Sequence, residues 1–405
     1  MSWFSNLFNG KKIKVTRTKD GTWSYFQDKD SFEHYSGHYL DLSYKNIALF
    51  TALDLRSTIF STGKPILKNA DGDVIESHPL LDLFKNPNYA QSQQDYLYSH
   101  LWFKSLGNNI ARVIPKRPKG KSNDLQNAHG IENLIPSCID YREVNKVQDF
   151  VFAPSQKEEV ENQEIKYTIG AKDHLLRVGD LAFFYDVTNN MIPDSYLKSP
   201  SRITALLPDL LNIQEAQSAM NVNLKHSKKW LISTKVNYNN GAMDMRPDEK
   251  KEVEDSFHYK DVIATNADVA TESLIVDFRK LMYDDIIASA SLRVFSAYRI
   301  TKDVLNWWKD GQTTYDNRGH GVVEFIQGSM KFEADDWGST WVNYFGLEEE
   351  GLKLSLDFSE HHVMNLLEVK RSEGMERKSR IVKTLTDAGV PYEEALELSG
   401  LKDVV

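Results

Sequence analysis

The spacing of apolar residues changes near residue 200, and this change limits the folds that the chain can adopt. Before it, short apolar runs separated by turn residues predict a mixture of strands and helices. After it, apolar residues recur at helical spacing as far as about residue 226. These residues are Ile203, Leu206, Leu207, Leu210, Leu211, Met220 and Leu224. The sequence therefore predicts an α+β chain in which long helices follow a mixed region.

The mixed region predicts helices and strands in close succession. Leu49, Ala52, Leu53 and Phe60 lie on one side of the first expected helix. Gly107-Asn108 is a plausible left-handed stop for the second. In order, we expect a helix over 45–61, an extended segment over 65–67, a turn at 71–73, a helix over 92–106, a strand over 109–114 and several short strands across 131–187.

The long helices should begin at Ser199-Pro200, where serine can cap and proline can occupy the first helical position. Pro208 lies inside this helix and predicts a kink or a junction of two helices. A second long helix is expected over 273–305, with small residues from Ala288 to Ser291. The stretch between them is mixed, with a strand expected from Trp230 to Lys235.

For the remainder of the chain, from residue 306 on, the sequence predicts a loop, another long helix and a helical tail. Residues 306–321 are punctuated by glycine and read as a loop. Gly328 and Gly338 interrupt the following helix and could bend it. Its apolar face contains Ile326, Met330, Ala334, Trp337, Trp341 and Phe345. A strand is expected over 352–358, and helices over 359–401 with a turn at 388–391.

Composition narrows the class of protein. A length of 405 residues favours two or more domains. The net charge of −9 disfavours a regulator or nuclease that grips duplex DNA, but it suits a wall along which DNA slides. Cys138 is the single cysteine, which excludes an internal disulfide and fits a reducing cytoplasm. No apolar run approaches the length of a membrane-spanning helix.

The N-terminal segment from Met1 to Lys14 places apolar residues before basic ones, the reverse of a signal peptide. A small docking helix and a loose arm remain equally open.

Two short motifs resemble ligand sites but favour plainer interpretations. Gly120-Lys121-Ser122 is similar to the end of a phosphate-binding loop, but Pro115 stands where that motif needs glycine. A solvated basic turn is the better interpretation. Glu360-His361-His362 offers metal-binding side chains, but adjacent histidines point to different sides of a helix or strand. We expect no metal and no cofactor.

Three pairs of adjacent residues leave their roles open. Asp284-Asp285 and Asp335-Asp336 should diverge on helices, which favours solvated helix faces over acid–base catalysis. Two adjacent tryptophans, Trp307-Trp308, cannot both face one core from a regular helix. They either form an interface or close the preceding helix against the next.

An ordered set of motifs resembles the portal proteins of long-tailed bacteriophages. The resemblance spans about residues 45–400, and no single motif carries it. The motifs are Leu53-Asp54-Leu55-Arg56-Ser57 followed by Pro65-Ile66, His78-Pro79-Leu80-Leu81-Asp82-Leu83 leading to Asn86-Pro87-Asn88, Leu106-Gly107-Asn108-Asn109-Ile110-Ala111-Arg112, Ile131-Glu132-Asn133-Leu134-Ile135-Pro136, Leu181-Ala182-Phe183-Phe184, Ser199-Pro200-Ser201, and the stretch from Leu385 to Ala395. Tyr298 to Lys302 departs from the glycine-valine-proline-proline turn usual in the family.

The resemblance implies a portal fold with an α/β wing, a long-helix stem, a small clip and a helical crown, assembling as a ring. It assigns the wing to 1–200, stem helices to 201–227 and 273–305, the clip to 228–272, a tunnel loop to 306–321, a kinked long helix and wing completion to 322–358, and the crown to 359–405.

A portal of this family is a non-enzymatic ring, typically of about twelve subunits, at one capsid vertex. It conducts double-stranded DNA without sequence specificity during packaging and ejection, and it nucleates head assembly. Its implied partners are the major capsid or scaffold protein, the large terminase and then a head–tail adaptor, without a membrane. It would be assembled in the host bacterial cytoplasm and reside in the virion.

The resemblance also assigns residues to the channel. The implied tunnel-loop residues are Trp307, Trp308, Lys309, Asp310, Arg318 and His320. The alternatives are another head–tail structural protein, such as an adaptor or minor capsid protein, and a metal-dependent hydrolase that uses Glu360, His361 and His362.

Overall fold

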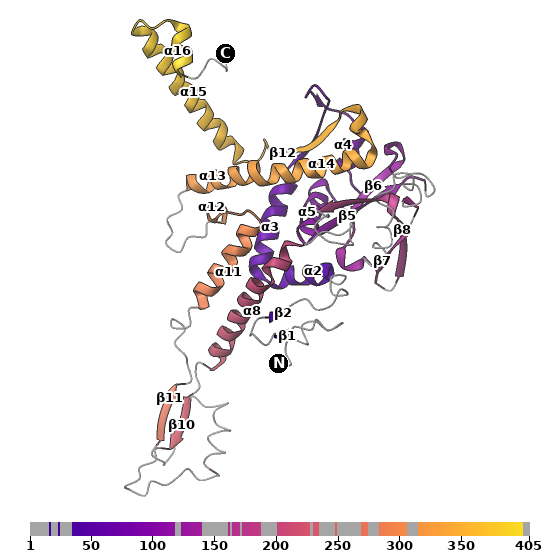
Figure 1. Cartoon of the computed structure of the whole chain (residues 1–405), viewed down its shortest axis with the longest axis vertical. Coiled ribbons are helices and arrows are strands. Elements are labelled where there is room, and N and C mark those ends of the chain that lie inside the picture. Colours follow the sequence, from indigo (N-terminus) through magenta and orange to yellow (C-terminus); the bar gives the residue numbers. More distant parts are fainter. Residues whose placement is uncertain are drawn as a thin grey trace. The chain divides into compact units, whose positions relative to one another are not determined.

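The chain folds into two compact units. Figure 1 labels the helices and strands of the described residues. Unit 1 comprises Met1–Ala205 and Phe295–Val405, and unit 2 comprises Leu206–Val294. The computed structural model describes residues 16–17, 23–24, 35–117, 123–139, 161–162, 164–170, 172–187, 201–226, 230–234, 248, 269–273, 283–305 and 315–399. In the described part it is a mixed helix and sheet structure, as the sequence predicts.

Two helices near the N-terminus of unit 1 begin the fold, after the short antiparallel pair β1 (Thr16–Arg17) and β2 (Trp23–Ser24). Helix α2 spans Tyr35–Lys45 and α3 spans Ile47–Ser61. Asn46 separates them, and its side chain accepts hydrogen bonds from the first backbone N–H groups of α3. The predicted apolar face of α3 is fully buried, which confirms the first expected helix.

Helix α5 (Gln93–Ser105) packs against α3 and follows the shorter α4 (Pro79–Lys85). Ser92 and Asp95 form a capping box at its start, each side chain bonding the other's backbone N–H. The helix ends at Leu106, and Gly107 follows with a φ of 143°. This confirms the predicted helix and its glycine stop.

A three-stranded antiparallel sheet continues from α5. Strand β5 (Asn108–Pro115) lies between β6 (Ala128–Asn133) and β9 (Leu181–Tyr185). Ala111 is central to the register, opposite Asn133 on one side and Ala182 on the other. A hairpin of β7 (Glu164–Ile169) and β8 (Lys172–Arg177) packs nearby and shares a buried cluster with the sheet. The cluster contains Ile110, Leu134, Ile139, Ile165, Tyr167, Leu176, Val178 and Leu181.

A second sheet joins the two sequence halves of unit 1. Strand β3 (Lys64–Lys68) pairs with β4 (Val74–Ile75) and with β12 (Lys353–Asp357), all antiparallel. The pairing of Ser355 with Ile66 shows that residues far apart in sequence fold together. Both strands of this long-range pair agree with the sequence predictions.

The long helix before β12 consists of α13 (Tyr315–Phe325), a π-helical turn η8 (Ile326–Met330) and α14 (Lys331–Phe345). Gly328 lies in the π-helical turn, whereas α14 runs through Gly338 without interruption. A Cβ on Gly338 would lie only 1.8 Å from the backbone oxygen of Leu354. This glycine therefore allows α14 to lie directly on β12.

Aromatic side chains fill the core beneath α14. Trp337 and Trp341 are fully buried, and both lie against Phe84 from α4, with ring centroids 4.6 and 5.4 Å away. Phe184 from β9 lies 5.5 Å from Trp341. The apolar face predicted for this helix is therefore the face that packs against the core.

Unit 2 contains most of two long helices and a strand pair. Helix α8 spans Arg202–His226, and α11 spans Tyr283–Ala297. Strands β10 (Trp230–Thr234) and β11 (Val269–Ser273) pair antiparallel along their whole length. Within the unit, Arg293 of α11 donates two hydrogen bonds of 2.8 and 2.6 Å to Asp209 of α8.

The structure corrects the start and the expected break of α8. The helix begins at Arg202, and the Ser201 hydroxyl accepts a hydrogen bond from the backbone of Ile203. The predicted cap and first helical residue, Ser199 and Pro200, lie outside the described residues. The helix continues through Pro208, so the two-helix alternative is wrong.

The single helix predicted over residues 273–305 is confirmed only in part, since α11 and the short α12 lie within it as separate helices. Ser273 ends β11 and pairs with Trp230, a long-range contact that apolar spacing does not reveal. Helix α11 ends at Ala297, and Arg299 follows with a φ of 60°. Because this left-handed backbone cannot continue a helix, the short α12 (Lys302–Leu305) forms a separate element.

The tail forms the two expected helices, α15 (Met364–Asp387) and α16 (Tyr392–Ser399). Gly389 takes a φ of 91° in the predicted turn, and Val382 is buried against Leu385 and Val390. Four short 3-10 turns complete the described elements: η2 (Leu125–Asn127), η3 (Pro136–Cys138), η6 (Val178–Asp180) and η9 (Leu347–Glu350). Among the described helices, none is long and apolar enough to cross a membrane.

Candidate functional site

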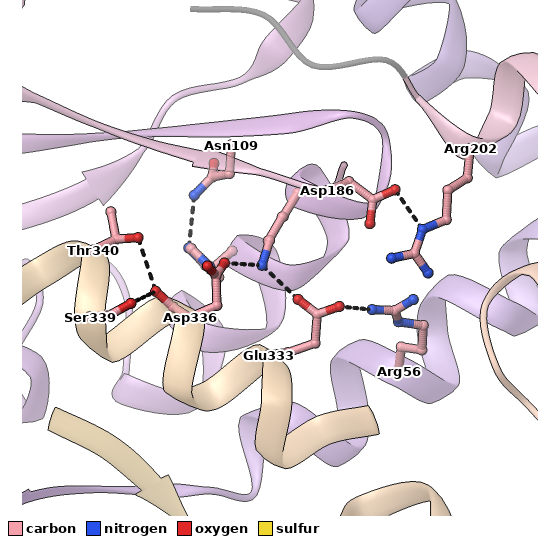
Figure 2. Close-up of polar contacts among 10 residues, drawn as sticks. Arg56, Asn109, Asp186, Arg202, Glu333, Asp336, Ser339 and Thr340 are labelled. Carbon is pink, nitrogen blue, oxygen red and sulfur yellow. Dashed lines mark hydrogen bonds and ion pairs between the residues drawn. The ribbon is translucent and has the colours of Figure 1, made fainter. Parts of the chain in front are cut away.

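Unit 1 contains a group of charged side chains that are mostly buried (Figure 2). We call it the ionic cluster. It joins α3, α5, α8, α14 and the residue that follows β9. Its members are Arg56, Lys104, Asp186, Arg202, Glu333 and Asp336.

Glu333 is the centre of the ionic cluster. Its two carboxylate oxygens accept hydrogen bonds from different cations, one from Arg56 at 2.7 Å and one from Lys104 at 2.6 Å. Lys104 also donates to Asp336, one turn further along α14, at 2.6 Å. Arg56 and Lys104 are almost completely enclosed, with side-chain exposures of 0% and 3%. One carboxylate thus ties α14 to both α3 and α5.

The surroundings keep these groups charged. Burial alone would raise the pKa of Glu333, but Lys104 and Arg56 outweigh burial and lower that pKa to about 2. Burial alone would lower the pKa of Lys104, whereas Glu333 and Asp336 raise it above the ordinary value. At neutral pH Glu333 and Lys104 therefore both carry their charge.

Asp186 and Arg202 form the second part of the ionic cluster. Arg202 Nε lies 3.0 Å from Asp186 Oδ2, yet neither carboxylate oxygen receives a hydrogen bond of good geometry. The Asp186 side chain is only 1% exposed. Burial therefore dominates and raises the pKa of Asp186 to about 6, despite the nearby Arg202 and Arg56. Asp186 is poised to change charge in mildly acidic solution.

The chemistry of the ionic cluster favours a structural role over catalysis. Its carboxylates are engaged by cations, and Asp186 and Glu333 are enclosed by protein rather than open to a substrate. What the arrangement can do is hold five elements in one register, because each charge needs its partner in place.

Sequence reasoning did not identify the ionic cluster. One signal was present, since Arg56 interrupts an apolar helix and Glu333 lies on the apolar face between Met330 and Ala334. Their pairing across 277 positions has no local signature.

The structure places two of the predicted channel residues. Arg318 and His320 lie on helix α13 and are exposed, so the prediction of a loop as far as residue 321 is wrong. Gly319 and Gly321 are buried on the same helix, and a Cβ on Gly321 would lie 2.9 Å from that of Asp303. Gly321 therefore serves close packing rather than a loop. Trp307, Trp308, Lys309 and Asp310 lie outside the described residues.

The paired histidines lie together rather than on opposite sides. His361 and His362 have ring centroids 4.5 Å apart, because they occupy a turn before α15 and not a regular helix or strand. Burial, with His362 nearby, lowers the pKa of His361. Glu360 pairs with Lys64. The described residues contain no group of three or more metal-binding side chains.

The adjacent aspartates have separate surroundings. Asp284 and Asp285 are exposed in the first turn of α11, as predicted. Asp335 accepts a hydrogen bond from Ser355 at 2.6 Å, whereas Asp336 belongs to the ionic cluster. The Asp336 side chain is 42% exposed, so the prediction of a solvated face holds only in part for it. Residues 118–122, which include the basic motif, lie outside the described part of the chain.

Comparison with known proteins gives a likeness of fold. No protein-family model and no curated protein matches the sequence. The structure is similar to a chain in the neck of an empty gene transfer agent (GTA) particle computed with C6 symmetry, at a TM-score of 0.55 and 13% identity. That likeness covers 90% of this chain and 93% of the other.

Further solved structures share the likeness. A chain in the neck of the native GTA particle, computed with C12 symmetry, matches at a TM-score of 0.55, 12% identity and the same coverage. An HK97-family phage portal protein from Corynebacterium diphtheriae is more distant, at a TM-score of 0.48 and 11% identity over 78% of this chain and 94% of that one. At these identities the likeness to the GTA neck chains shows a shared fold and no more.

Proposed function

We propose that this chain is one subunit of a phage portal, a ring at one capsid vertex through which DNA enters and leaves. The observation that carries the proposal is the fold shared with particle-neck proteins over 90% of the chain, one of them in a C12-symmetric neck. The ordered portal-like motifs along residues 45–400 support it independently of the fold.

The proposed architecture follows from the same motifs. The wing takes residues 1–200 and 322–358, and the crown takes 359–405. The stem comprises α8 and α11, with the β10–β11 pair in the clip between them. The tunnel loop precedes α13 and includes Trp307, Trp308, Lys309 and Asp310.

A ring converts single charges into belts of charge. Arg318 and His320 of α13 would each repeat once per subunit, as would Lys309. Such belts attract DNA phosphates weakly and without reading the sequence. The net charge of −9 per chain opposes adhesion elsewhere. A sliding duplex needs this balance of weak contacts and general repulsion.

The subunit itself catalyses no reaction in this proposal. The terminase motor would dock on the clip and supply ATP hydrolysis, and a head–tail adaptor would later replace it there. The ring would also nucleate head assembly with the capsid or scaffold protein. It would assemble in the host bacterial cytoplasm and remain in the virion.

The decisive experiment is native mass spectrometry of the purified chain over a range of concentrations, with negative-stain images of the same samples. We expect rings of about a dozen subunits with a central hole. A chain that stays monomeric when concentrated would contradict the proposal.

A deletion tests the tunnel-loop assignment separately. Removing residues 307–313, which precede α13, should leave ring size unchanged and impair DNA packaging or retention. Loss of rings in this variant would contradict the tunnel-loop assignment while leaving the ring proposal intact.

A further inference from the structure

The chain crosses between its two units twice, and both crossings are fastened inside unit 1. Unit 1 ends its first segment at Ala205 and resumes at Phe295. Helix α8 begins at Arg202, three residues before the first crossing, and α11 ends at Ala297, two residues after the second. The residues at these two helix ends contact one another.

Arg202 holds the two helix ends together. Its Nη1 group donates a hydrogen bond of 3.2 Å to the backbone oxygen of Ala297. The same guanidinium forms the ion pair with Asp186, and its carbon lies 5.8 Å from the centre of the Tyr298 ring. Arg202, at the start of α8, thus contacts Ala297 at the end of α11, Tyr298 one residue further on, and Asp186 after β9.

Tyr298 fastens the same point to the interior of unit 1. Its side chain is fully buried, and its hydroxyl donates a hydrogen bond of 3.1 Å to the backbone oxygen of Ser105 at the end of α5. Arg56 also lies over this ring, 5.3 Å from its centre. Two guanidinium groups therefore contact one tyrosine, and one of them is held by Glu333 of α14.

The first turn of α8 has another attachment. The hydroxyl groups of Thr204 and Tyr39 lie 2.9 Å apart, which joins α8 to α2. Arg299, next to Tyr298, adopts the left-handed conformation that ends the helical run. The chain therefore turns sharply where it is fastened.

We propose that Arg202 and Tyr298 form a clasp that makes the two crossings open and close as one cooperative unit. Loosening either residue releases both helix ends, since each is the other's neighbour and both depend on the same buried surroundings. A change that loosens either crossing also affects α14, because Arg56 contacts Tyr298 and is held by Glu333. This inference concerns the chain alone and does not require the portal function.

Hydrogen exchange of the full-length protein, followed by mass spectrometry of its peptides, tests the clasp. Tyr298→Phe keeps the ring and removes the bond to Ser105; Arg202→Gln removes the bond to Ala297 and the charge beside Asp186. Loss of one buried hydrogen bond corresponds to roughly tenfold faster exchange. We expect that increase in both segments, residues 203–210 and 294–301, for either variant.

The control is Arg293→Gln, which removes an ion pair between the same two helices at a side chain that is 56% exposed. We expect its exchange to change by less than about twofold in either segment, because exposed pairs contribute little. Faster exchange confined to the segment that carries the substitution would overturn the clasp. An equal increase in exchange for Arg293→Gln would also overturn the clasp, because the exposed ion pair of Arg293 would then couple the two helices. Tyr298→Phe is conservative and keeps the test informative if Arg202→Gln does not fold.

Discussion

Replacing Glu333 with glutamine should destabilise unit 1 strongly. The change leaves the shape of the side chain and removes the charge that faces Arg56 and Lys104. Lys104 keeps Asp336, which is partly solvated, but Arg56 keeps no carboxylate at hydrogen-bond distance among the described residues. Its side chain is fully enclosed, so water cannot replace the lost partner.

Two independent estimates give the size of the effect. Lowering the pKa of Glu333 from 4.5 to about 2 corresponds to about 3 kcal/mol of folding free energy at neutral pH. Removing one partner of a buried ion pair typically costs about 3–5 kcal/mol. We therefore expect the free energy of unfolding to fall by about 3 kcal/mol.

Urea unfolding followed by tryptophan fluorescence measures this loss, because urea does not screen charges. Trp337 and Trp341 are fully buried on the same helix and contribute to the signal. Glu324→Gln is the matched control, an exposed glutamate on α13 whose replacement should change stability by less than about 0.5 kcal/mol. A loss below about 1 kcal/mol for Glu333→Gln would refute the reasoning.

Three further predictions follow from the same geometry. Gly338→Ala should lower the free energy of unfolding by about 3 kcal/mol in thermal unfolding, because its Cβ would meet the β12 backbone. Gly328→Ala should be tolerated, since nothing lies within 4 Å of its Cβ. The pKa of Asp186 is raised from 3.8 to about 6, so the folded state binds the extra proton. As pH rises from 4 to 6, the free energy of unfolding should lose about 2 kcal/mol of this contribution, and Asp186→Asn should abolish the loss. Arg318→Glu should leave ring size unchanged and reduce DNA packaging. Lys331 is also exposed but lies on α14, so Lys331→Glu should affect packaging less.

The elements that sequence reasoning found are those with local signals. The start of α5 is encoded by Ser92 and Asp95, and its end by Gly107, all within the segment itself. The apolar face around Trp337 and Trp341 has helical spacing and packs as predicted. Local capping and periodicity therefore positioned α3, α5 and α14, whereas α2 and α4 were not predicted.

The errors arose where distant contacts decide the structure. Ser273 is a strand residue because it pairs with Trp230, more than forty positions earlier. Gly319 and Gly321 were interpreted as loop residues, but they are buried where α13 packs closely. Glycine permits both a turn and a close approach, and only the neighbour in space distinguishes them.

The ionic cluster is hard to explain as a source of stability alone. Replacing a buried ionic group by apolar residues of similar volume is often neutral or stabilising, because desolvating the charges is costly. A triple variant, Arg56→Met, Lys104→Met and Glu333→Leu, should therefore recover most of the stability that Glu333→Gln loses. It should leave the clasp of Arg202 and Tyr298 in place but uncouple it from α14, because Tyr298 would lose the guanidinium that connects its ring to α14.

The triple variant would therefore separate stability from coupling. One result would show that the charges couple the helices. In it, the triple variant is stable and its two crossings still exchange slowly together, but hydrogen exchange in α14 no longer changes with exchange at the crossings. If the triple variant kept the response of α14, apolar packing alone would transmit it, and the charges of the ionic cluster would have no role in coupling.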